Sequence, residues 1–128
     1  MTREILFRGK SKLTGMFLEG NLVIGRNGET SIVWFNTEQK ECWTSVCPDT
    51  IGQYTGLKDK NGKKIFEGDI LVCGREWTTL VLWNEELATF ALQFIFENKV
   101  GKTPLGEWQP MEVISNIYDN PELLKGGK

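Results

Sequence analysis

Three carboxylates lie close together near the middle of the chain, at Asp59, Glu67 and Asp69. A pair of carboxyl groups held in a cleft can act as general acid and general base. No nucleophile motif accompanies them, and the sequence contains no histidine that could serve as an imidazole base. Asp side chains in turns commonly accept hydrogen bonds from nearby backbone amides. We therefore predict a turn-stabilising role for these carboxylates and no enzymatic activity.

The three cysteines, Cys42, Cys47 and Cys73, raise the question of a thiolate metal site. Their spacing contains no Cys-x-x-Cys pair, and no histidine is present to complete a zinc site. An odd number of cysteines also argues against a closed set of disulfides. We expect free thiols, buried or half-buried, and no metal or other cofactor.

Four lysines crowd one short stretch, at Lys58, Lys60, Lys63 and Lys64. Basic residues near aromatic ones, such as Tyr54, can follow the phosphate backbone of a nucleic acid. Acidic residues interrupt the run, however, and the whole chain has a net charge of −2. A lysine-rich turn is also an ordinary solvated surface, so nucleic acid is an alternative partner and not the favoured one.

The sequence contains five tryptophans, at Trp34, Trp43, Trp77, Trp83 and Trp108. Aromatic side chains line peptide grooves on small β-domains, but they are equally typical of cores and subunit interfaces. Trp77 and Trp83 are an even number of residues apart, so on one regular strand they would share a face. Tyr54, the four lysines, Trp77 and Trp83 together form the candidate binding surface.

Glycine and asparagine divide the chain into short segments rich in β-branched and aromatic residues, which is typical of an all-β barrel or sandwich. The expected strands cover residues 4–8, 16–24, 30–35, 42–46, 70–73, 77–83, 89–96 and 111–118, with a loop over 97–106. Gly20 is expected at a bulge or at a close approach of two backbones. Short helical turns are expected at 48–51 and at the C-terminus, where Asn120-Pro121 precedes Gly126.

The chain is organised around a turn-dense stretch from Gly52 to Val72. Within it, Asn61-Gly62 is expected to form a type I′ turn, with positive φ at both residues. The later run from Leu92 to Phe96 contains one polar residue and is more apolar than one exposed face tolerates. We expect it to be covered on both sides, for example by another subunit.

Three blocks of sequence together resemble the YopX family of phage and prophage proteins. They are REILFRGK at 3–10, TIGQYTGLKDKNGKKIFEGDI at 50–70 and EVISNIYDNPELL at 112–124. The resemblance implies small SH3-like β-barrel units and a phage or prophage genome context, and it implies no activity. Cys47 stands where the family usually has Asp, and Ser115 where it usually has Gly; both departures concern local turn geometry.

The length of 128 residues suits a single YopX-like domain over 1–128. Two candidate sub-units divide it, an N-terminal β-sheet over 1–48 and an SH3-like barrel with a C-terminal tail over 49–128. The apolar and charged fractions, 40% and 25%, are ordinary for a globular protein. We expect no signal peptide and no membrane span, and hence a location in the cytoplasm of a bacterial host.

These observations predict a small all-β phage or prophage protein that works as a binding or assembly module without catalysis. The expected partners are a second copy of the chain and an unknown protein, with no membrane. The alternative is a nucleic-acid-binding accessory factor that uses the turn from Lys58 to Lys64.

Overall fold

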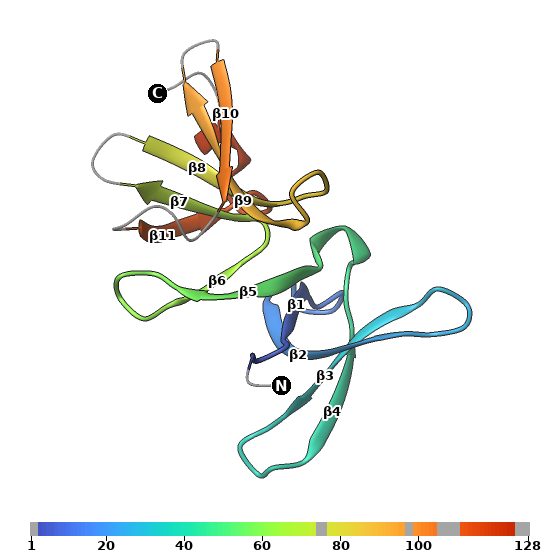
Figure 1. Cartoon of the computed structure of the whole chain (residues 1–128). Coiled ribbons are helices and arrows are strands. Elements are labelled where there is room, and N and C mark those ends of the chain that lie inside the picture. Colours follow the sequence, from blue (N-terminus) through green and yellow to red (C-terminus); the bar gives the residue numbers. More distant parts are fainter. Residues whose placement is uncertain (1–2, 74–76, 97–98, 105–110, 125–128) are drawn as a thin grey trace. The chain divides into compact units, whose positions relative to one another are not determined.

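The computed structural model of the chain describes residues 3–73, 77–96, 99–104 and 111–124 (Figure 1). Regular structure in these residues consists of eleven strands and two 3-10 turns, without an α-helix. The all-β prediction is therefore confirmed. None of the described segments forms a helix long and apolar enough to cross a lipid bilayer.

The strands follow one another along the chain in short segments, eight of which overlap the predicted strands, whereas those at 52–58, 64–66 and 99–104 were not predicted. They are β1 (Phe7–Lys10), β2 (Phe17–Ile24), β3 (Thr30–Phe35), β4 (Glu41–Ser45), β5 (Gly52–Lys58), β6 (Lys64–Phe66), β7 (Asp69–Cys73), β8 (Trp77–Asn84), β9 (Thr89–Phe96), β10 (Lys99–Pro104) and β11 (Met111–Asn116). The 3-10 turns are η1 (Pro48–Thr50) and η2 (Pro121–Leu124), which confirms both predicted helical turns.

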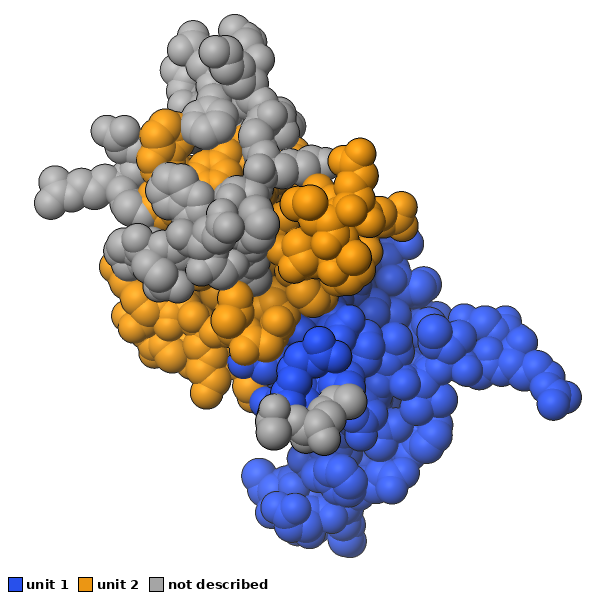
Figure 2. Space-filling model, in the orientation of Figure 1, with its two compact units in different colours: residues 1–54 blue, residues 55–128 orange. Residues whose placement is uncertain are grey.

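The strands form two antiparallel sheets, ordered β4-β3-β2-β1-β5-β6 and β10-β9-β8-β7-β11. Neither sheet closes into a barrel within the described residues, so the SH3-like part of the fold prediction is not confirmed. The chain divides into two compact units, residues 1–54 and residues 55–128 (Figure 2). This division lies within β5, whereas the sequence analysis places its boundary between residues 48 and 49.

Unit 1 is a meander of β1 to β4, to which the start of β5 returns by pairing with β1. Its innermost side chains are Ile32 and Val46, both fully buried. Thr30 ties these strands together, because its hydroxyl donates to the Val46 carbonyl at 3.0 Å. An isolated bridge also joins Ser11 to Val46, which brings the end of β4 back to the residue that follows β1.

Gly20 on β2 lies where two backbones approach each other closely. A Cβ atom built on Gly20 would lie 2.1 Å from the carbonyl oxygen of Val33. Real Cβ atoms never come so near a backbone oxygen, so only glycine fits at this position. The predicted close approach at Gly20 is confirmed.

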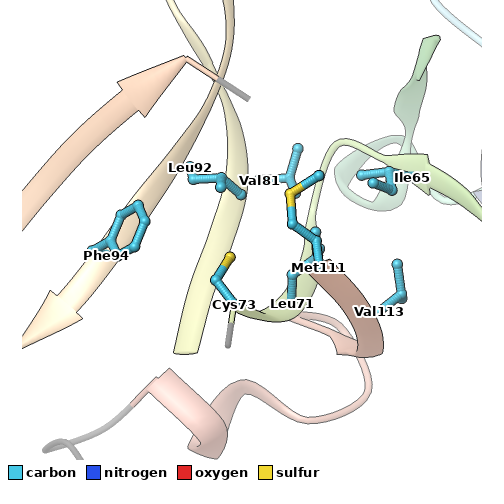
Figure 3. Close-up of a cluster of buried hydrophobic side chains, with 8 residues drawn as sticks. All are labelled: Ile65, Leu71, Cys73, Val81, Leu92, Phe94, Met111 and Val113. Atoms are coloured by element: carbon cyan, nitrogen blue, oxygen red, sulfur yellow. The ribbon is translucent and has the colours of Figure 1, made fainter. Parts of the chain in front are cut away.

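Unit 2 is built around a cluster of buried apolar side chains that come from β6, β7, β8, β9 and β11 (Figure 3). Its members are Ile65, Leu71, Cys73, Val81, Leu92, Phe94, Met111 and Val113. The strand register explains this grouping, since Val81 pairs with Leu92 and Leu71 pairs with Val113, which places these side chains on one face. Burial raises the pKa of the Cys73 thiol, and the nearby Thr79 hydroxyl opposes that rise.

Two local predictions in unit 2 are wrong. Residues 99–104 form β10, paired with β9 along its whole length, where the sequence analysis expects a loop. The turn at Asn61-Gly62 is not type I′, because Gly62 has φ +84° but Asn61 is not in the positive-φ region. Instead, the Gly62 N–H donates to the Asp59 carbonyl and the Asp59 N–H donates to the Lys63 carbonyl. This is the three-residue hairpin loop that ends on a left-handed glycine.

Candidate binding surfaces

The basic turn, residues Lys58 to Lys64, is shaped by the carboxylate of Asp59. One carboxylate oxygen, Oδ1, accepts hydrogen bonds from the backbone N–H groups of Asn61 and Lys63, both at 2.9 Å. The other, Oδ2, accepts from the N–H of Val113 on β11 at 3.0 Å. A further bond of 2.9 Å runs from the Lys60 N–H to the Met111 carbonyl. The turn is thus fixed to the outer edge of β11.

The ionised form of Asp59 is favoured by these donors. Burial of the side chain on its own would raise the pKa of the carboxyl group. The hydrogen bonds from the N–H groups of Val113, Lys63 and Asn61, together with the charge of Lys63, outweigh burial and hold the pKa below its ordinary value of 3.8. Asp59 therefore carries its negative charge inside the turn at neutral pH.

The four predicted lysines lie on this one turn, but they differ in exposure. Lys58, Lys60 and Lys63 are exposed, whereas Lys64 is half-buried. Lys60 forms an ion pair with Glu112, with a distance of 3.6 Å between Nζ and Oε1. The lysines most open to solvent and not engaged in that pair are Lys58 and Lys63.

Two of the three carboxylates that could have formed a catalytic group accept hydrogen bonds from the backbone. Asp69 is 1% exposed and its Oδ2 accepts a hydrogen bond of 2.7 Å from the Phe66 N–H. Asp59 is buried and accepts the three bonds given above. Glu67 is half-buried on the turn that precedes β7. Both aspartates bond to backbone donors, as the sequence analysis predicts for turn-stabilising side chains.

The three cysteines are free thiols, with Cys42 and Cys47 half-buried and Cys73 buried. Across the described parts of the chain, no three Cys, Asp or Glu side chains are grouped so that they could hold a metal ion.

The predicted aromatic members of the surface are not equivalent. Trp77 packs against the core cluster of unit 2, with its ring edge-on to Phe94 at a centroid distance of 6.3 Å. Trp83 lies at the other end of β8, is 45% exposed and meets Phe90 edge-on at 5.2 Å. Tyr54 is buried in unit 1, so it is not available as part of a binding surface, and the other six predicted residues belong to unit 2. Trp108 lies outside the described residues.

The β3–β4 hairpin carries two exposed aromatic residues that were not part of the predicted binding surface. Phe35 and Trp43 are each 59% exposed. Trp43 pairs with Val33 across the two strands, so Trp43, Val33 and Phe35 lie on the same face of the hairpin. The indole N–H of Trp43 donates to the Glu41 carboxylate on that face. The sequence did contain an indication of this exposure, the unbroken apolar run from Ile32 to Phe35. Side chains alternate between the two faces of a strand, so one buried face cannot hold all four of them.

The loop between β8 and β9 also combines apolar and charged exposed residues. Leu87 is 56% exposed, and it follows two exposed glutamates, Glu85 and Glu86. The Asn84 side chain accepts a hydrogen bond of 2.9 Å from the Leu87 N–H, and Ala88 has a φ of +52°.

Comparison with known proteins identifies the family of the chain by sequence and a solved structure that shares its fold. The YopX protein family model matches residues 6–125, so the chain is a member of that family. A solved structure titled "Crystal structure of protein EF1440 from Enterococcus faecalis" is similar to it, with a TM-score of 0.59 and 23% sequence identity. That match covers 97% of this chain and 100% of the other, and it supports the fold alone. None of the curated proteins compared with the chain matches it significantly.

Proposed function

We propose that this protein is a non-enzymatic binding and assembly module that works in the cytoplasm of a bacterial host carrying the phage or prophage. It binds a protein partner and also associates with copies of itself. The single observation that carries the proposal is the exposure of Phe35 and Trp43 on one face of the β3–β4 hairpin. Adjacent exposed aromatic residues are typical of surfaces that another protein covers.

We further propose an SH3-like character for unit 1, in place of the SH3-like barrel that the sequence analysis expects over residues 49–128. An SH3-like unit is a short antiparallel meander whose last strand returns to its first. Unit 1 has the strand order β4-β3-β2-β1-β5, with η1 between β4 and β5. Two backbone bonds also link its ends, from the Lys12 N–H to the Ser45 carbonyl at 3.0 Å and from the Cys47 N–H to the Lys10 carbonyl at 2.9 Å. Slow hydrogen exchange at Lys12 and Cys47 would support closure, and exchange at the rate of a free amide would contradict it.

The binding role is tested by affinity capture from host cells in which the phage genes are expressed. The wild-type chain is compared with a variant that carries Phe35→Ser and Trp43→Ser. Leu13→Ser is the matched control, because Leu13 is a large apolar residue that is 92% exposed and belongs to the turn between β1 and β2, not to β3 or β4. We expect a partner on the wild type and the control that is lost from the double variant. The same proteins on all three baits would contradict the proposed surface.

Nucleic acid bound by the basic turn is the alternative function. The observation that favours it is the solvent exposure of Lys58 and Lys63. A gel shift that weakens with salt and is abolished by Lys60→Glu with Lys63→Glu would support this alternative. A lack of any shift at low salt would exclude it.

A further inference from the structure

Unit 2 carries two exposed loops of opposite charge that each include an apolar residue. The basic turn presents Lys58 and Lys63 beside Leu57, which is 38% exposed. The β8–β9 loop presents Glu85 and Glu86 beside Leu87. Neither of these glutamates forms an ion pair with any residue that the structure describes. Each loop therefore combines charged residues with an exposed apolar residue, and the charges of the two loops are opposite in sign.

The opposite charges of the two loops are too far apart to neutralise each other within one molecule. The basic turn is bonded to Met111, and Met111 pairs with Cys73, which in turn pairs with Trp77 at the start of β8. The acidic loop follows Asn84, at the other end of the same strand. A strand of eight residues is about 23 Å long, which exceeds the screening length of roughly 8–10 Å in physiological salt. Figure 1 shows the β5–β6 and β8–β9 loops on opposite sides of unit 2.

We propose that these loops join two copies of the chain, with the basic turn of each copy seated on the β8–β9 loop of the other. In a two-fold arrangement the symmetry axis exchanges the two copies, so the contact is made twice. Trp83 and Leu87 supply the apolar centre on one side and Leu57 on the other. The lysines and glutamates form the charged rim, which sets orientation and salt dependence. This inference rests on the self-association in the proposed function, and it names the surface through which the copies associate.

Hydrogen bonds within both loops support their use as contact surfaces. Asp59 fixes the basic turn through three backbone hydrogen bonds, and Asn84 fixes the acidic loop through the Leu87 N–H. Loops that are already ordered lose little conformational entropy on binding. The edge-on contact of Trp83 with Phe90 likewise holds the exposed indole in one orientation.

Charge reversal on either side gives a sharp test. One variant carries Glu85→Lys and Glu86→Lys, and a second carries Lys58→Glu and Lys63→Glu. Each variant alone places like charges in both copies of the contact, so its dimer dissociation constant should rise at least about tenfold. An equimolar mixture of the two variants restores opposite charges in both contacts, so a heterodimer of wild-type affinity should form. Sedimentation velocity with one variant fluorescently labelled measures all three cases.

Two controls separate this contact from general charge effects. Glu19→Lys with Glu29→Lys makes the same change in net charge at exposed positions of unit 1, and it should leave the dissociation constant unchanged. Leu87→Ser should weaken the dimer and leave its salt dependence unaltered, because it removes only apolar contact. Thermal melting of every variant shows that the fold is retained.

The outcomes distinguish this inference from the proposed function. A wild-type chain that stays monomeric at all concentrations contradicts the self-association itself. A wild-type oligomer whose affinity is unchanged in both charge-reversal variants, or whose mixed variants form no heterodimer, overturns the loop pairing alone. Loss of nucleic-acid binding in the Lys58→Glu, Lys63→Glu variant, with an unchanged oligomer, would assign the basic turn to nucleic acid and likewise overturn the pairing.

Discussion

The carboxylate of Asp59 accepts a hydrogen bond of 3.0 Å from the backbone N–H of Val113, which lies 54 residues later in the chain. Through this bond the tip of the β5–β6 hairpin covers the outer edge of β11 in unit 2. Exposed strand edges are templates for unwanted pairing, and natural sheets often cover them with a loop. The same side chain therefore shapes the basic turn and protects an edge of the sheet.

Asp59→Asn is expected to lower the free energy of unfolding by about 1.5–3 kcal/mol at pH 7. The Asn oxygen can still accept bonds within the turn, but its amide group would face the Val113 N–H with a donor instead of an acceptor. Urea denaturation of the full chain measures the change. A loss below about 0.5 kcal/mol would contradict the structural role of the carboxylate.

The same variant should alter the pH dependence of stability. The pKa of Asp59 is lowered in the folded chain, so its stabilising contribution is fully present above about pH 4 and is lost as the pH falls through the folded-state pKa. Urea midpoints measured between about pH 2 and pH 7 should fall less steeply with acid in Asp59→Asn than in the wild type. Glu112→Gln is the comparison, because Glu112 is half-exposed in a surface ion pair. Identical acid slopes for Asp59→Asn and the wild type would refute the assignment.

Gly20→Ala should destabilise unit 1 by at least about 2 kcal/mol. The added Cβ would collide with the Val33 carbonyl, and a backbone atom cannot move aside as a flexible side chain can. Gly25→Ala serves as the control, since its nearest neighbour is the end of the Asn27 side chain at 3.2 Å. Equal losses for the two variants would show that helix or strand propensity, and not the close approach, sets the cost.

Gln39 and Ala88 are expected to be sites where glycine stabilises the protein. Both have positive φ, at 64° and 52°, which costs a residue with a Cβ about 1 kcal/mol or more. Gln39→Gly should therefore raise the melting temperature by a few degrees, after the entropic cost of glycine is subtracted. Thr37 in the same loop lacks this strain, so Thr37→Gly should lower the melting temperature. A lower melting temperature for Gln39→Gly would contradict the positive φ.

Gly62→Val replaces a glycine that has positive φ, at the tip of the basic turn, with a residue that carries a Cβ. Gly62 has φ +84°, a region that a β-branched residue adopts only with strain. We expect a loss of about 2 kcal/mol, although no atom outside the turn lies within 4 Å of the added Cβ position. Unchanged stability in urea denaturation would rule out the left-handed conformation at Gly62.

The sequence predicts the strand-rich architecture well where alternation and turn residues agree. Glycine at position 20 and the apolar residues of β3, β8 and β9 lead to the observed strands and to the close approach of β2 and β3. The strand β10 was missed because Gly101 and Pro104 read as loop residues, and only its pairing with β9 makes it a strand. The type of the turn at Asn61-Gly62 was predicted wrongly because this dipeptide suits two hairpin geometries. The hydrogen bonds to Asp59 select between them.

The candidate surface could be predicted only in part. Proximity in sequence placed the four lysines on one turn, since a turn keeps its own residues together. Strand parity put Trp77 and Trp83 on one face, but it could not show that the core cluster buries Trp77 while Trp83 extends past it. The exposure of Phe35 and Trp43 depends on which face of the hairpin the rest of unit 1 covers, and that is a tertiary property.

The most direct test of a protein that acts by association is sedimentation velocity of the wild-type chain from about 1 µM to about 100 µM. We predict a concentration-dependent shift from monomer to dimer that weakens as salt is raised, because charged loops contribute to the contact. A single monomeric species across the whole range, at low and at high salt, would contradict the account.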